Sequence, residues 1–192
     1  KWTRKKRRTK DLSLEEENQV ADVGKDIEKW IGQVVAKKHK ESGATICPFA
    51  KKTLQDRKIQ ITMAKKDVLS QINHCCGLFN VFHLDIVILY LEQPITEKKL
   101  SNLCQKAHKQ NPKFAIMYDH PENDGLHKGV SFSYGKLPLI MIQDLEKLRQ
   151  AQKILKKSGY YQKWDIDSFQ NAVMFTDAVT TDAWKEFIHN DS

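Results

Sequence analysis

Several motifs that identify common enzyme classes are absent from this chain of 192 residues. It has no Walker loop, GxGxxG, HExxH or nucleophile elbow, so the sequence gives no basis for the enzyme classes that these motifs define. Its longest apolar run, LDIVILYL at 84–91, is far shorter than the ~20 residues of a membrane-spanning helix. No internal repeat or low-complexity linker divides the chain.

The cysteines and the first residues also lack familiar patterns. Four cysteines are present, and their spacing makes no CxxC pair and no zinc ribbon: Cys47, Cys75, Cys76 and Cys104. The first ten residues, KWTRKKRRTK, have no apolar core after their charges, so no signal peptide is expected there. We therefore expect reduced thiols and a cytoplasmic location.

The positive charge of the chain is concentrated at its start. The net charge is +8, but residues 1–10 hold seven Lys/Arg and no acid, which leaves 25 basic against 24 acidic side chains in 11–192, a net of +1. We expect 1–10 to be a basic arm and 11–192 to be one globular domain. The arm would bind phosphates by releasing counterions, or it is a solvated tail. The candidate nucleic-acid contacts in the arm are Arg4, Lys5, Lys6, Arg7 and Arg8.

Hydrophobic periodicity and capping residues predict alternating helices and strands. A capping box at Ser13 and Glu16 opens a helix that Gly43 ends, and three further helices begin after Asp67, Thr96 and Asp144. Strands are expected at 58–64, 84–91, 113–119 and 137–142, with a loop at 120–129 and a packed, aromatic-bearing tail at 160–192. This order predicts an α/β (or α+β) fold with a mainly parallel or mixed sheet of four to five strands and helices on its faces.

In such sheets ligands bind beyond the carboxyl ends of the strands. We expect those ends at Lys65, Glu92, Asp119 with His120, and Gln143 with Asp144.

The stretch ICPFAKK at 46–52 follows the first helix and precedes a strand. It resembles an uncharacterised family of small bacterial cytoplasmic proteins that carries Leu-Cys-Pro-Phe-Ala-Lys in the same setting. That family also has a His-Pro pair at a strand end and a later proline leading into a Leu-rich strand and a helix, features matched here by His120-Pro121 and Pro138. The resemblance covers about residues 25–158 and implies a similar fold, but no reaction. Where the family has Arg-Ser-Pro-Tyr-Pro, this chain reads Tyr-Gly-Lys-Leu-Pro at 134–138, without the arginine.

Cys47 has two interpretations. It could be a nucleophile, with positive charge from Lys51 and Lys52 and a base in His120, or a small buried residue whose neighbours fix a turn. A thioredoxin-type thiol is disfavoured, because Cys47 follows a helix, precedes a strand by about ten residues and has Ala50 where a second cysteine would stand.

The loop YDHPENDGLH is the densest polar cluster in the sequence. Its possible metal ligands, for iron or zinc, are His120, Glu122, Asp124 and His127. The alternatives are general acid–base catalysis by Asp119 and His120, or turn chemistry alone.

Two functions follow from these observations. The first is a small enzyme of unassigned reaction, possessing a pocket shared by Cys47, Asp119 and His120 and binding a small polar substrate through Lys51, Glu92 and Lys136. The second is a module that binds nucleic acid or another polyanion through the basic arm. A concave pocket lined by the three catalytic candidates would favour the enzyme.

Overall fold

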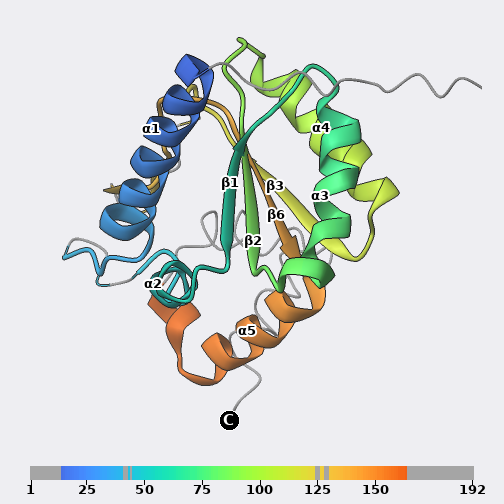
Figure 1. Cartoon of the computed structure of the whole chain (residues 1–192). Coiled ribbons are helices and arrows are strands. Elements are labelled where there is room, and N and C mark those ends of the chain that lie inside the picture. Colours follow the sequence, from blue (N-terminus) through green and yellow to red (C-terminus); the bar gives the residue numbers. More distant parts are fainter. Residues whose placement is uncertain (1–13, 41–42, 44, 124–125, 128–129, 164–192) are drawn as a thin grey trace, which may run out of the picture.

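The computed structural model describes residues 14–40, 43, 45–123, 126–127 and 130–163. Its centre is a four-stranded sheet of order β1-β2-β6-β3, formed by Ile59–Met63, Ile86–Tyr90, Leu139–Asp144 and Phe114–Asp119. β1 and β2 are parallel, and β6 runs antiparallel to both of its neighbours. β1, β2 and β3 therefore point the same way, and β6 is reversed. This mixed sheet with helices alongside confirms the predicted fold class (Figure 1).

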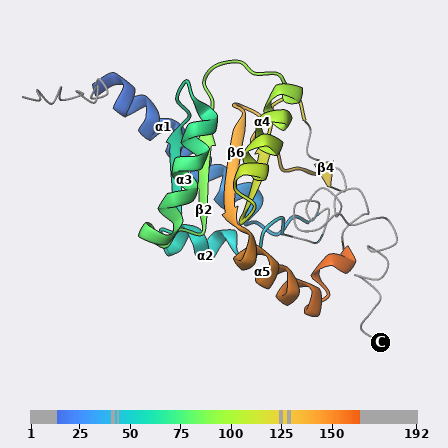
Figure 2. The ribbon, with the colours of Figure 1, turned by 90° about the vertical axis from the view of Figure 1, so that its right-hand side faces the viewer.

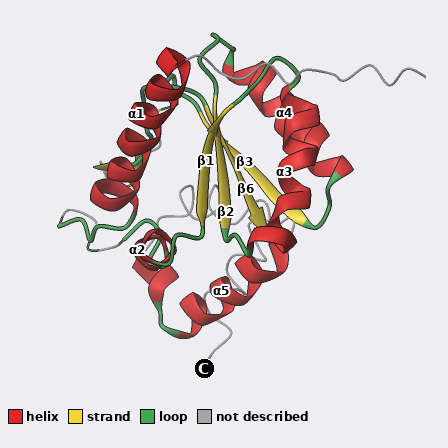
Figure 3. Ribbon diagram, in the orientation of Figure 1, coloured by secondary structure: helices red, strands yellow, loops and turns green. Residues whose placement is uncertain are grey.

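The helices flank the strands (Figure 3). In chain order they are α1 (Leu14–Trp30), which continues into the π-helical turn η1 (Ile31–Val35), α2 (Ala50–Gln55), α3 (Val68–Phe82), α4 (Glu97–Gln110), α5 (Leu145–Lys157) and the 3₁₀ turn η2 (Tyr160–Lys163). Among the described residues, none of these helices has both the length and the apolar character needed to cross a membrane.

Each face of the sheet buries its own apolar cluster, because successive strand residues point to opposite faces. Val87 and Leu89 of β2 belong to the cluster beneath α3 and α4, the face seen in Figure 2. Ile88 and Tyr90 belong to the cluster beneath α1, which contributes Ile27. β2 is apolar on both faces for this reason, as its sequence predicts.

Three of the predicted helix N-caps are confirmed, and the fourth, Ser13, lies outside the described residues. Asp67 accepts a hydrogen bond from the Ser70 backbone N–H, Thr96 from that of Lys99, and Asp144 from that of Lys147. Gly159 follows α5 with φ +67°, the left-handed conformation that glycine adopts without steric cost.

Three predictions about the first half of the chain and the sheet need correction. The first helical segment ends at Val35 rather than Gly43, because the residues that follow, AKKHK, offer no apolar face to bury. Residues 50–55 form α2, a helix that was not predicted from the sequence. β6 is antiparallel to its neighbours, so Gln143 and Asp144, at its carboxyl end, lie beside the amino end of β3. Asp119 lies at the opposite end of the strands.

A fourth correction concerns the predicted loop at 120–129. It contains β4 (Leu126–His127), which pairs with β5 (Val130–Ser131) as a separate two-stranded sheet. The basic arm and the tail beyond Lys163 lie outside the described residues.

Candidate functional site

Asp119 ends β3 at the edge of the sheet where β1 and β2 also end. Its Oδ1 accepts a hydrogen bond of 2.8 Å from the Ser133 hydroxyl, and its Oδ2 accepts one of 2.8 Å from the Tyr134 backbone N–H. Burial raises the pKa of Asp119, and the hydrogen bonds to Ser133 and Tyr134 oppose that rise without cancelling it. Both oxygens thus fasten the strand end to the segment before β6.

His120 is only 4% exposed, and both of its ring nitrogens are engaged by the backbone. Nε2 lies 2.8 Å from the Ile95 carbonyl oxygen, to which it can only donate, and Nδ1 accepts from the Glu122 N–H at 3.2 Å. This pattern places a ring hydrogen on Nε2. The side chain joins the connection between β2 and α4 to the end of β3, which leaves no ring nitrogen for a substrate or a metal.

The predicted metal set is only partly within the described structure. Asp124 and the side chain of His127 lie outside it, and Glu122 is exposed. Within the described residues, no group of three or more His, Cys, Asp or Glu side chains could hold a metal ion.

Cys47 lies just before the turn that leads into α2. Its N–H donates to the Val35 carbonyl at 2.9 Å, and its carbonyl accepts from the Ala50 N–H at 3.2 Å. The Tyr160 hydroxyl covers the same turn and donates to the carbonyls of Thr45 and Ile46, the latter at 2.8 Å. Burial raises the pKa of the Cys47 thiol despite opposing hydrogen bonds from the Phe49 and Ala50 N–H groups. A nucleophilic thiolate needs the opposite shift.

The structure separates Cys47 from His120. Cys47 precedes α2, which leads into the amino end of β1, whereas His120 follows the carboxyl end of β3. Because β1 and β3 point the same way, these residues lie at opposite ends of the sheet (Figure 1). The predicted shared pocket is therefore wrong. Lys51 is exposed on α2 at the Cys47 end, and Glu92 is exposed beyond β2 at the other end.

Lys136 is held by a carboxylate that was not among the predicted site residues. Its Nζ lies 2.9 and 2.6 Å from Oδ1 and Oδ2 of Asp26 in α1, and the Tyr134 hydroxyl donates to the same Oδ2 at 2.7 Å. Trp30, one turn further along α1, donates to the Phe132 carbonyl at 3.3 Å and packs edge-on against Tyr134. We call Asp26, Trp30, Tyr134 and Lys136 the α1 latch. They fix α1 to the segment that Asp119 also holds.

Contacts within the α1 latch shift the pKa values of two of its residues, Asp26 and Tyr134. The hydrogen bonds from Lys136 and Tyr134 lower the pKa of Asp26. Burial, reinforced by the hydrogen bond to the Asp26 carboxylate, raises the pKa of Tyr134. Lys136 is thus already paired, which weakens its assignment as a contact for an anionic substrate.

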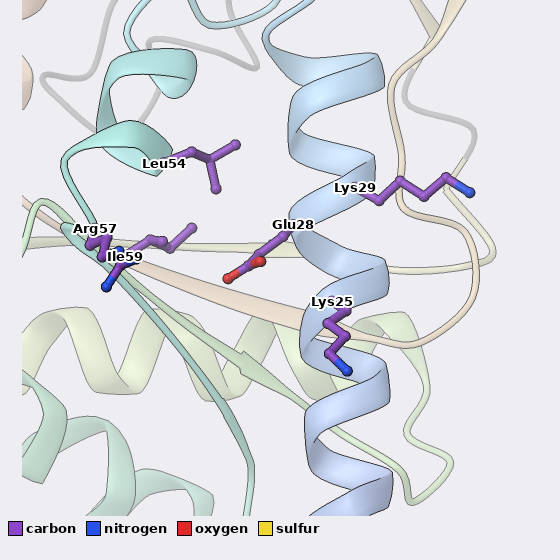
Figure 4. Close-up of a pocket in the computed structure, with 6 residues that line it drawn as sticks. All are labelled: Lys25, Glu28, Lys29, Leu54, Arg57 and Ile59. Carbon is purple, nitrogen blue, oxygen red and sulfur yellow. The ribbon is translucent and has the colours of Figure 1, made fainter.

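The two most distinct surface hollows formed by the described residues are not lined by Cys47, Asp119 or His120. The larger, of about 630 Å³, lies between α1 and the α2–β1 connection, and we call it the α1–α2 groove (Figure 4); its lining residues are Lys25, Glu28, Lys29, Leu54, Arg57 and Ile59. The smaller, of about 220 Å³, involves α4 and β3, with lining residues Glu97, Lys98, Ser101, Asn102 and Tyr118.

The nearly neutral body conceals two strongly charged segments. Residues 11–28 hold one basic and seven acidic side chains, a net of −6, whereas 29–58 hold eight basic and two acidic ones, a net of +6. We call 29–58 the basic segment. The basic segment can be found from the sequence when charge is counted over short segments rather than over all of residues 11–192. Its exposed cations are Lys29, Lys37, Lys38, Lys40, Lys51, Lys52 and Arg57.

Comparisons with known proteins do not place the chain in a family. No protein-family model matches it, and neither a curated protein nor a solved structure does so.

Proposed function

We propose that this protein binds nucleic acid or a similar polyanion, with the basic arm as one contact and the folded body as another. The observation that carries the proposal is the basic segment. It forms the end of α1, η1 and α2, which lie together beside the edge strand β1 (Figure 1). A protein that neutralises several phosphates releases their counterions, so dense, exposed cations favour binding to a polyanion at moderate salt.

The environments of the catalytic candidates support binding over catalysis. Cys47 lies far along the sheet from His120, its thiol has a raised pKa, and the ring nitrogens of His120 are held by backbone groups. Asp119 spends both carboxylate oxygens on the segment before β6. These contacts support a structural role for the three residues. The three side chains share no surface on which one substrate could contact all of them.

The test compares the full chain with a variant that has Arg4, Lys5, Lys6, Arg7 and Arg8 replaced by Gln. Binding to a labelled oligonucleotide is measured by fluorescence anisotropy at several salt concentrations. The slope of log K against log salt should become shallower by about 3 to 5, because five contacts contribute roughly 0.7 each on single strands and 0.9 each on duplex. Weaker, still salt-sensitive binding should remain from the basic segment. A full-length protein that does not bind at low salt would refute the proposal.

A further inference from the structure

We propose that the α1–α2 groove binds the sugar–phosphate backbone of a single nucleic-acid strand, in addition to whatever the arm contacts. This inference rests on the proposed function, because it names the part of the folded body that would hold the polyanion. The groove has an open mouth and a volume of about 630 Å³, within the ~300–1,000 Å³ range of ordinary ligand sites. An extended strand can lie along such a groove without unfolding any element around it.

The walls of the groove carry more positive than negative charge. Lys25 and Lys29 stand one helical turn apart on α1, Arg57 comes from the opposite wall, and Glu28 is the acid among the lining residues. Figure 4 shows Glu28 reaching from α1 toward Leu54, whereas the Lys29 side chain extends from the other side of α1, away from Leu54. The lining residues thus include three cations and one carboxylate. This excess of positive charge favours a chain of phosphates, and the carboxylate can lie between two successive phosphates.

These cations are weakly engaged within the protein. Lys25 is 3.9 Å from Asp22, and both side chains are about four-fifths exposed, so this pair contributes little. Within the described part of the chain, Lys29 and Arg57 form no ion pair within 4.0 Å. An external phosphate would therefore compete only with the weak Lys25–Asp22 pair and with the electrostatic attraction between Lys29 and Asp26.

Arg57 occupies a backbone position that suits glycine better. Its φ is +54°, directly after α2, and an L-residue adopts this left-handed conformation at a steric cost. His83 ends α3 in a similar conformation, with φ +51°, so the conformation alone assigns no role. What distinguishes Arg57 is that its side chain lines the groove. Replacing it with glycine relieves the backbone and removes the cation together, so stability and binding should respond differently.

The surroundings of the groove favour a single strand over a duplex. A duplex would have to admit α1 into its major groove, as recognition helices do. Ile27 of α1 and Ile31 of η1 are buried in the apolar cluster beneath α1, so this side of the helical segment is not available to enter a groove of a duplex. No aromatic residue is among those that line the groove, so we expect contacts to phosphates without base stacking and little sequence preference.

The experiment uses the full chain and a fluorescein-labelled oligothymidylate of about 15 nucleotides, with a duplex of the same length for comparison. One variant replaces Lys25, Lys29 and Arg57 by Gln. A matched control replaces Lys106, Lys109 and Lys113, exposed lysines of α4 and the chain before β3, by Gln and so has the same net charge. The groove variant should lose about 2 from the single-strand salt slope, roughly 0.7 for each contact. The control should lose far less.

Two single variants test the sign of the effect and separate binding from folding. Glu28→Gln removes the negative charge in the groove and should tighten binding. Arg57→Gly should lower the salt slope by about 0.7 and leave Tm unchanged or raise it by about 2–4 °C. A residue with a purely structural role would change Tm without changing the slope.

The outcomes separate this inference from the proposed function. If the wild type binds but the groove variant behaves like the control, the groove is refuted and the arm-based function stands. A preference for the duplex refutes the single-strand assignment. Millimolar inorganic phosphate could compete for the groove as effectively as unlabelled oligonucleotide does. That result would refute the assignment of a nucleic-acid strand and would indicate a site for a small anion. If the wild type binds no oligonucleotide, both proposals fail.

Discussion

The α1 latch makes a quantitative prediction about how α1 is held. In Asp26→Ala, the Tyr134 hydroxyl loses its acceptor although Tyr134 is only 7% exposed. A hydrogen bond to a charged group contributes about 1.5–3 kcal/mol, and a buried hydroxyl left without a partner costs about 1–3 kcal/mol. The Lys136 pair adds little, since the Lys136 side chain is 63% exposed and the Asp26 side chain 35%. We expect Asp26→Ala to lower the free energy of unfolding by about 2 kcal/mol.

A double-mutant cycle isolates this hydrogen bond. Tyr134→Phe removes the donor and should cost about 1–2 kcal/mol, and the double variant should cost less than the sum of the two single variants by about 1 kcal/mol. The assay is urea unfolding at pH 7, and a difference of 1 kcal/mol corresponds to about 2–4 °C in Tm for a chain of this size. Costs that add within about 0.3 kcal/mol would show that the two side chains do not interact, and the latch would then be wrong.

The same variant has a predictable pH dependence. The pKa of Asp26 is lowered in the folded protein, so its charge stabilises the fold above the unfolded value of ~3.9, and this contribution is lost as the pH falls through the folded pKa. The difference in stability between wild type and Asp26→Ala should therefore be constant between about pH 5 and 8 and shrink below about pH 4. A difference that instead grows toward acid pH would contradict the assigned direction.

Two further predictions concern residues that the sequence singled out. Since burial raises the pKa of Cys47, iodoacetamide at pH 8 should modify it much more slowly in the native protein than in urea, as read by mass spectrometry; rapid native labelling that Cys47→Ala abolishes would restore the reactive-thiol hypothesis. His120→Leu should lower the free energy of unfolding by about 1–3 kcal/mol, because the Ile95 carbonyl loses its partner, whereas His74→Leu at an exposed site on α3 should change it by less than about 0.5 kcal/mol. Equal effects in urea unfolding would argue against a stabilising hydrogen bond between His120 and Ile95.

The strands and the helix starts could be predicted because their causes are local. Asp67, Thr96 and Asp144 each accept a hydrogen bond from a backbone N–H only three residues later, so the sequence contains both partners. The run at 84–91 is apolar at every position of β2, which requires cover on both faces of the sheet. α2 was not predicted because it is a single short segment. The signal in the sequence was the spacing of Ala50 and Leu54, which are four residues apart and both pack against the cluster beneath α1.

The candidate site could not be predicted in the same way, because its partners are distant in sequence. The sequence by itself determined the helix caps, the strands, the concentration of charge in the arm and, by segment, the basic residues of 29–58. Only the tertiary structure decided that β6 runs against its neighbours, that Cys47 and His120 lie at opposite ends of the sheet, and that Tyr134 meets Asp26 across 108 residues. The physical reason is that a hydrogen bond or a groove depends on which elements pack together, and that arrangement is fixed by burial over the whole chain rather than by any one segment.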